Sequence, residues 1–349
     1  MTAQELSWLA LWGATALYAI AMVASAVHLA RVADAKVAAK ARAEHKVTAA
    51  GGAANGSAES TATRASAPTT ASATPALHDK ANGIAKATTL MGALLQGVGV
   101  VARGVEAGHV PWSTMYEYTI TGTWVAVVVF LIVQRKRDVS YLAPGVTGFA
   151  TIALGLGMTV LYAQSTGLQP ALQSFWLIIH VSIAIIATGI FTVGAVATVL
   201  QLWRDYRDDS ELPVADAGNA LTRASRRWRN WNVRVLKSWT WLEAVPAPAK
   251  LEALAFRLHA VGFVLWTFTV MAGAVWAEHA WGRYWGWDPK EVWSFVIWVI
   301  YAAYLHARTT QGWAGRRSAV LALIGFVALI MNFTVVNLVF QGLHSYAGV

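Results

Sequence analysis

A run of eighteen residues, Trp276 to Trp293, concentrates the side chains suited to contact a flat ligand. Five of its positions are tryptophan: Trp276, Trp281, Trp285, Trp287 and Trp293. Gly282, Gly286 and the Asp288-Pro289 pair break a regular helix, so the indoles can be presented from irregular backbone. An ordinary aromatic belt spreads over many spans and over both membrane surfaces. The concentration of tryptophan in one loop therefore favours an aromatic-lined ligand platform.

Histidines lie at two depths relative to this loop. His180 lies about five residues into an apolar segment, within roughly 8 Å of its end, and Trp176 is one turn earlier on the same face. His344 lies just beyond the end of the last apolar segment. His306 follows Trp293 by 13 residues, which places it about 20 Å deeper along one helix. Ionisable groups at such depth are candidates for function.

The elements that must position these residues are membrane spans. Of 349 residues, 56% are hydrophobic and 13% are charged, about half the charged fraction of a soluble domain. Eight segments have the length and apolarity of a span: 6–30, 88–107, 118–134, 141–163, 175–203, 257–278, 292–308 and 319–341. The predicted fold is an all-α, polytopic integral membrane bundle of about eight transmembrane helices.

The positive charge orients this bundle. With the N-terminus outside, the regions predicted to be cytoplasmic hold 24 of the 27 Lys and Arg residues. Such residues are retained on the cytoplasmic side, so both termini are expected to be extracytoplasmic. The formal charge of +9 is then explained by topology and does not call for nucleic acid as a partner.

The sequence divides into three parts. Residues 1–30 form the first span, and 31–87 an Ala/Ser/Thr-rich cytoplasmic linker that is predicted to be flexible because it has little apolar surface to bury. Residues 88–349 form a seven-helix domain with a basic cytoplasmic loop, 204–257. Within that loop, the basic, Trp-bearing segment 222–241 is typical of a helix in the lipid headgroup layer.

Residues Trp281 to Trp293 resemble the tryptophan-rich "WWD" signature of haem-handling proteins of cytochrome c maturation. Further stretches resemble the CcsA/ResC type, the cytochrome c synthase subunit of system II: Gly108-His-Val-Pro with Tyr116-Glu117, Phe175-Trp-Leu-Ile-Ile-His180, and Gly342-Leu-His344-Ser-Tyr346. The resemblance covers roughly residues 88–349. A mild departure is Trp112 after Pro111, where a smaller residue is expected.

The resemblance implies that the ligand is haem b. His180 and His344 would hold the iron at an external site, and His306 would be a transmembrane haem ligand. The external site would be lined by Trp176, Trp281, Tyr284, Trp285, Trp287, Asp288 and Trp293. Asp288 is also expected to cap a helix, and Arg283 and Lys290 are candidate partners for the haem propionates. His28 and His259 are expected to be interface residues at cytoplasmic span ends, although either could supply the second ligand opposite His306.

The implied function is that of a haem lyase, or holocytochrome c synthase, in a bacterial cytoplasmic membrane. The chain would move haem to the external platform and present it to apocytochrome c, whose CxxCH thiols form thioethers with the vinyl groups. No residue is expected to act by acid–base catalysis, and the chain would act by positioning. The absence of Cys fits, because the reactive thiols are then the substrate's. Implied partners are a CcsB/ResB-type membrane subunit and thiol-reducing proteins.

Three other functions compete with this one, and one of them is a transporter of another substrate that would use the tryptophan platform as a gate. A haem-transfer protein of the CcmC type would form no thioether, but eight spans and the His344-Ser-Tyr346 terminus argue against it. A b-type cytochrome that transfers electrons would need facing His pairs on long helices, whereas this sequence offers scattered single histidines.

Overall fold

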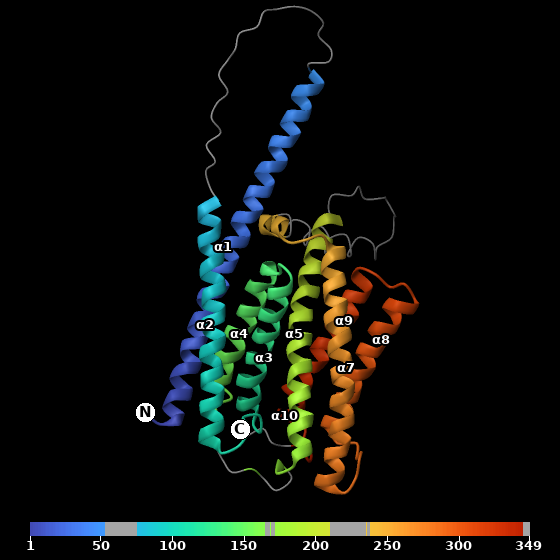
Figure 1. Cartoon of the computed structure of the whole chain (residues 1–349). Helices are drawn as coiled ribbons and strands as arrows, with labels where there is room; N and C mark the ends of the chain where they lie inside the picture. Colours follow the sequence, from blue (N-terminus) through green and yellow to red (C-terminus); the bar gives the residue numbers. More distant parts are fainter. Residues whose placement is uncertain (53–74, 165–167, 169–171, 210–234, 236–237, 345–349) are drawn as a thin grey trace, which may run out of the picture.

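The computed structural model is a bundle of long helices (Figure 1). It describes residues 1–52, 75–164, 168, 172–209, 235 and 238–344, except the side chains of 46–52 and 75–79. Across these residues every regular element is helical: α1 (Ala3–Gly52), α2 (Pro75–Ala107), α3 (Met115–Lys136), the 3₁₀ turn η2 (Ser140–Leu142), α4 (Ala143–Thr159), α5 (Phe175–Asp209), the 3₁₀ turn η4 (Thr240–Ala244), α7 (Pro248–Trp281), α8 (Pro289–Thr310), α9 (Arg316–Phe333) and α10 (Val335–Val339). The predicted all-α membrane bundle is confirmed.

Eight long segments follow one another in the order that the sequence predicts. Seven of them, among the described residues, are long and apolar enough to cross a membrane; they contain α1, α2, α3, α4, α5, α7 and α9 with α10. The remaining one, α8, has 22 residues and so spans about 33 Å, although its Trp, Tyr and His residues make it less apolar. The last predicted span, 319–341, is broken near Thr334, where α9 gives way to α10.

The helices reach further into the predicted linker than its composition suggested. The interval 31–87 is helical up to Gly52, where α1 ends, and again from Pro75, where α2 begins. Residues 32–52 include eight Ala and three Lys, which are strong helix formers even where nothing packs against them. The remainder, 53–74, and most of the headgroup segment predicted at 222–241 lie outside the described residues.

Helix α5 lies at the centre of the bundle. In its most apolar stretch 72% of the residues are buried, compared with 33–56% in the six other apolar spans. Its buried residues join two cores: one is shared with α1, α3 and α4, and the other with α7, α8 and α9. Because α5 packs along α7 over their full length, His180 on α5 is fixed against α7.

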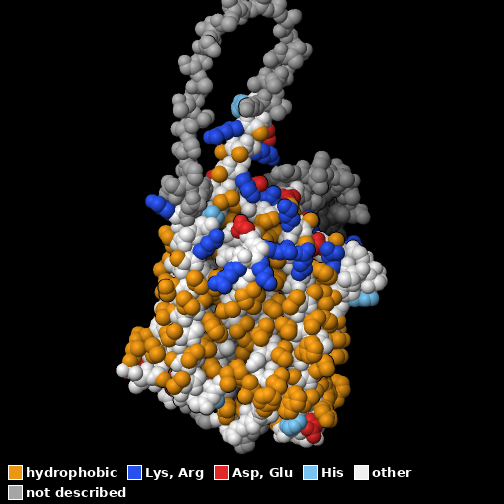
Figure 2. All heavy atoms as spheres, viewed as in Figure 1, with side chains coloured by type: hydrophobic (Ala, Val, Ile, Leu, Met, Phe, Trp, Pro, Cys, Tyr) orange, Lys and Arg blue, Asp and Glu red, His pale blue; other side chains and the backbone are white. Residues whose placement is uncertain are grey.

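Charge is concentrated at one end of the bundle. Figure 2 shows a broad apolar surface, with Lys and Arg side chains gathered at its upper end. The N-terminal end of α1 and the helix α10 lie toward the opposite end (Figure 1), where the loop Gly282–Asp288 also joins α7 to α8. We call this opposite end the Trp-loop end. It is the side that the sequence predicts to be extracytoplasmic.

Candidate functional site

The loop at the Trp-loop end is shaped by its own glycines and carboxylates. Gly282 ends α7 in a left-handed conformation (φ 68°) that glycine adopts without steric cost. Asp288 begins α8 as its N-cap in a capping box with Glu291, ahead of Pro289. The predicted helix-capping role of Asp288 is thereby confirmed.

Glu291 stabilises the loop through hydrogen bonds to its carboxylate. Its carboxylate accepts hydrogen bonds from Arg283 Nη1 at 3.0 Å, from the Gly286 N–H at 2.8 Å and from the Asp288 N–H at 3.1 Å. The Arg283 guanidinium lies so close to Gly286 that a Cβ there would lie 1.7 Å from its Cζ. Arg283 is thus paired within the loop through Nη1.

Asp288 also holds the C-terminal segment of the chain. His344 Nδ1 donates to Asp288 Oδ1 at 2.7 Å, and the Leu343 N–H donates to Oδ2 at 2.7 Å. Burial alone would raise the pKa of Asp288, but the hydrogen bonds and charge of His344 and the N–H groups of Lys290 and Leu343 outweigh burial and lower the pKa to about 2. An ionised carboxylate accepts only, so His344 must carry a proton on Nδ1.

His180 is fixed in the same way by a different acceptor. Its Nδ1 lies 2.8 Å from the main-chain oxygen of Thr269 on α7, and a carbonyl oxygen can only accept. Gly273 makes room for the ring, because a Cβ at that position would lie 2.7 Å from His180 Cε1. With Nδ1 protonated, a neutral imidazole keeps its free lone pair on Nε2.

Both imidazoles meet at Trp276. The ring of His180 stacks on Trp276 with centroids 5.9 Å apart, and His344 contacts the same indole edge-on at 5.4 Å. Trp281 completes the group, 4.8 Å from both Trp276 and His344. Residues more than 160 positions apart in sequence are thereby brought to one place at the Trp-loop end.

The two histidines and Trp276 border an apolar cavity of about 290 Å³, which we call the outer cavity. Its wall includes His180, Trp276, Trp285, Lys290, Asn332 and His344. An apolar cavity with a few converging polar groups is the usual form of a small-molecule site. Neither imidazole Nε2 has a hydrogen-bond partner in the described part of the chain, so both are available to a ligand.

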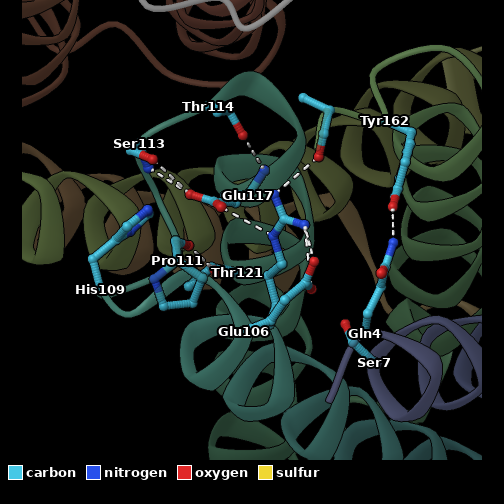
Figure 3. Close-up of polar contacts among 12 residues, drawn as sticks. Gln4, Ser7, Glu106, His109, Pro111, Ser113, Thr114, Glu117, Thr121 and Tyr162 are labelled. Atoms are coloured by element: carbon cyan, nitrogen blue, oxygen red, sulfur yellow. Dashed lines mark hydrogen bonds and ion pairs between the residues drawn. The ribbon is translucent and has the colours of Figure 1, made fainter. Parts of the chain in front are cut away.

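A buried ion pair supports the part of the outer-cavity wall that contains Ser113. Arg103 on α2 donates from Nε to Glu117 of α3 at 3.0 Å, and both side chains are 1% exposed. The same guanidinium contacts Glu106 at 3.3 Å and donates to the Ala163 carbonyl at 2.9 Å (Figure 3). Glu117 in turn accepts from the N–H and Oγ of Ser113, in the segment that lines the cavity.

The sequence-predicted site residues are only partly brought together. His180, His344, Tyr284 and Trp285 line the outer cavity, and Asp288 and Trp281 contact His344. Trp176 packs against the cluster of Leu172, Leu177 and Trp276. By contrast, Trp287 is 76% exposed in a left-handed conformation (φ 61°), and Trp293 packs into the core of α5, α7, α8 and α9. The tryptophans are thus divided between the cavity wall, the core and the exposed surface, where Trp287 contacts Trp285 edge-on with ring centroids 5.9 Å apart.

Two inner histidines differ from each other. His306 is an exposed residue of α8, one turn before that helix ends, and lies outside the outer cavity. His259, expected at a membrane interface, is instead fully buried between α5 and α8; its Nε2 lies 3.1 Å from Thr198 Oγ1, and its ring packs against Tyr301 and Tyr304. The interface assignment of His259 is thus wrong, because α5 and α8 cover the face of α7 that carries it.

Sequence reasoning did not assign roles to several residues that build the site. Thr269 acts through its main-chain oxygen and Gly273 through its missing side chain, and neither leaves a signal in sequence. Trp276 had such a signal, as part of the tryptophan run. Arg103 also had one, as a charge inside an apolar segment.

The comparisons with known proteins point to one family. The profile of the family described as "Cytochrome C assembly protein" matches residues 112–344, which contain His180, the tryptophan loop and His344. The chain belongs to the cytochrome c assembly protein family.

Within the cytochrome c assembly family, the chain is of the CcsA type. Cytochrome c biogenesis protein CcsA of Parasynechococcus marenigrum (strain WH8102) is 36% identical over 267 residues, which cover 76% of this chain and 86% of that protein. CcsA of Mesostigma viride is 36% identical over 251 residues, or 70% and 79% of the two chains. The chain is thus a multi-pass membrane protein of cytochrome c biogenesis.

A solved structure shares the fold of this assembly protein. "Cytochrome c Heme Lyase CcmF" aligns with a TM-score of 0.57 at 15% identity, over 100% of this chain and 49% of that one. At this identity the likeness concerns the fold alone.

Proposed function

We propose that the chain binds haem b in the outer cavity, with His180 and His344 on the iron, and presents it to apocytochrome c. The observation that carries this proposal is that both imidazoles donate a hydrogen bond from Nδ1. Each donates Nδ1–H to a fixed acceptor, Thr269 O or Asp288 Oδ1, and so offers a bare Nε2 at the cavity. This is the tautomer that metal-binding histidines adopt, with the other nitrogen held by a carboxylate or carbonyl.

The proposed reaction needs no acid or base from the chain. A cysteine thiol of the substrate CxxCH motif adds across a haem vinyl group: sulfur bonds to one carbon, and the thiol hydrogen ends on the other. Both thioethers form in this way, with reduced thiols maintained by other proteins. The chain contributes binding and orientation, which can account for much of a rate enhancement. Its fixed imidazoles and apolar wall suit that role.

The test is haem content and ligation yield after loss of both imidazoles. We expect the His180→Ala, His344→Ala double variant, purified with its CcsB/ResB-type partner, to lose the haem bound in the outer cavity and to form no holocytochrome; a Soret band that remains should disappear when His306→Ala is added. His279→Ala is the matched control, because His279 lies at the same end but is 51% exposed and does not line the cavity. Unchanged haem content and yield in the double variant would refute the external site.

His306 is proposed as a ligand of a second, inner haem site. Its side chain faces away from the described bundle, so the other half of such a site would come from the partner subunit. We expect His306→Ala to lower holocytochrome yield in cells but to leave haem binding at the outer cavity intact in purified protein supplied with haem. Loss of haem from the outer cavity in that assay would contradict the proposal that the chain has two separate haem sites.

A further inference from the structure

One cation at the Trp-loop end, Lys290, forms no ion pair with a carboxylate of the described residues. Lys290, in the first turn of α8, lines the outer cavity and donates from Nζ to the Asn332 main-chain oxygen at 2.7 Å. An ammonium group has three donors, so two remain. No carboxylate forms an ion pair with Lys290 among the described residues, whereas Arg283 pairs with Glu291.

The nearest acid does not fill this role. Asp288 directs its carboxylate to the Lys290 main-chain N–H and to the C-terminal segment, through His344 and Leu343. Among the residues that the structure describes, the Lys290 ammonium therefore has a neutral carbonyl as its hydrogen-bond partner at the edge of an apolar cavity. Such a charge is costly to desolvate unless an anion joins it.

A second polar group without a partner lies beside it. Asn332 of α9 is 8% exposed and lines the outer cavity, and its Oδ1 has no hydrogen-bond partner within the described part of the chain. Buried amide groups are nearly always satisfied, so this position calls for a ligand. Rotating the side-chain amide by 180° exchanges the positions of Oδ1 and Nδ2. Asn332 can then donate a hydrogen bond to the same anion as Lys290.

We propose that Lys290 and Asn332 form a carboxylate-binding end of the outer cavity, which takes a propionate of haem. This inference rests on the proposed function. The ligand that fits has a flat apolar body for the Trp276 side and a carboxylate for Lys290. In haem the propionates and the vinyl groups lie on opposite edges of the ring. Anchoring the propionate edge at Lys290 therefore turns the vinyl edge away from α8 and sets which way the reactive groups face.

The test compares haem with haem dimethyl ester, whose two propionates are uncharged. We expect the detergent-purified complex to bind haem at least about tenfold more tightly than the diester, as measured by Soret titration, because a charge-assisted hydrogen bond is lost with the ester. Lys290→Met should reduce this preference to within about twofold. Lys250→Met is the matched control, because Lys250 is exposed at the start of α7, at the basic end; it should keep the full preference.

A second variant, Asn332→Asp, keeps the inference testable if Lys290→Met does not fold. Asn332→Asp leaves Lys290 in place but supplies a carboxylate beside it, and it should also abolish the preference for free haem. The inference is overturned if the wild-type complex does not distinguish the two ligands, or if both variants keep the wild-type preference. Failure of the wild-type complex to bind either ligand overturns the proposed function, and this inference with it.

Discussion

His344 Nδ1 donates to Asp288 Oδ1 across 2.7 Å and so joins the C-terminal segment to the residue that begins α8. One carboxylate thereby caps a helix, fixes a histidine tautomer and secures the end of the chain. The loop of tryptophans and the second proposed iron ligand consequently depend on the same side chain.

Loss of this carboxylate should weaken haem binding. We expect Asp288→Ala to lower haem affinity by about 10- to 100-fold, the usual effect of removing the group that orients a metal-binding histidine. Asp288→Asn keeps an oxygen that can accept and should cost less. Soret titration measures both. As a control, Asp138→Ala removes an exposed acid that bonds Ser140 at the basic end, and its haem affinity should equal that of the wild type.

The Asp288–His344 contact should withstand acid. The pKa of Asp288 in the folded chain, about 2, is lower than its ordinary value of 3.8, so the contact contributes its full stability above pH 4 and loses it as the pH falls through 2. We therefore expect hydrogen exchange of the C-terminal peptide to stay slow, relative to the intrinsic rate, from pH 7 to about pH 4. Release of the peptide near pH 6 would contradict this.

A single methyl group at Gly273 should displace His180. The added Cβ would lie 2.7 Å from His180 Cε1 and 2.9 Å from Nδ1, closer than real contacts allow, so the ring must leave the Thr269 carbonyl. We expect Gly273→Ala to lose haem without unfolding. Gly155→Ala is the matched control, since it is also a helical glycine but has nothing within 4 Å of the new Cβ; it should bind haem normally and be slightly more stable. Equal haem content in the two variants would refute this placement of His180.

The buried pair behind the cavity wall should matter for stability. Glu117→Gln leaves the Arg103 guanidinium without its buried counter-charge, and we expect a loss of about 3–5 kcal/mol in the free energy of unfolding. Glu106→Gln removes the longer, more exposed contact of the same guanidinium and should cost about 1 kcal/mol or less. Unfolding in detergent by denaturant compares the two. The Arg103→Met, Glu117→Met double variant should be more stable than Glu117→Gln, since it leaves no buried guanidinium without its counter-charge and unpairs only Glu106, which is 18% exposed.

How far the site could be predicted differs from residue to residue. Asp288 as a helix cap follows from local order, because the residue directly precedes a proline and lies three positions before Glu291. His180 and His344 could be placed at one membrane depth from span lengths alone. Their acceptors could not, because a main-chain oxygen has no sequence signature and Asp288 is 56 positions from His344. His259 was placed at the correct end of its span but was expected at the membrane interface instead of in the core. Its depth follows from its position in the sequence, whereas the neighbouring helices decide which side of α7 is buried.

By itself, the sequence determined what depends on composition and local order: eight apolar segments, the side on which basic residues gather, the breaks around the tryptophan loop and the kinds of side chain available to bind a ligand. Only the tertiary structure decided which of those side chains share a cavity. It separates Trp287 and Trp293 from the indoles around His344, joins Lys290 to Asn332 and leaves His306 outside. The physical reason is that the rotation of each helix about its axis is fixed by packing against its neighbours, and that packing lies between segments far apart in the chain.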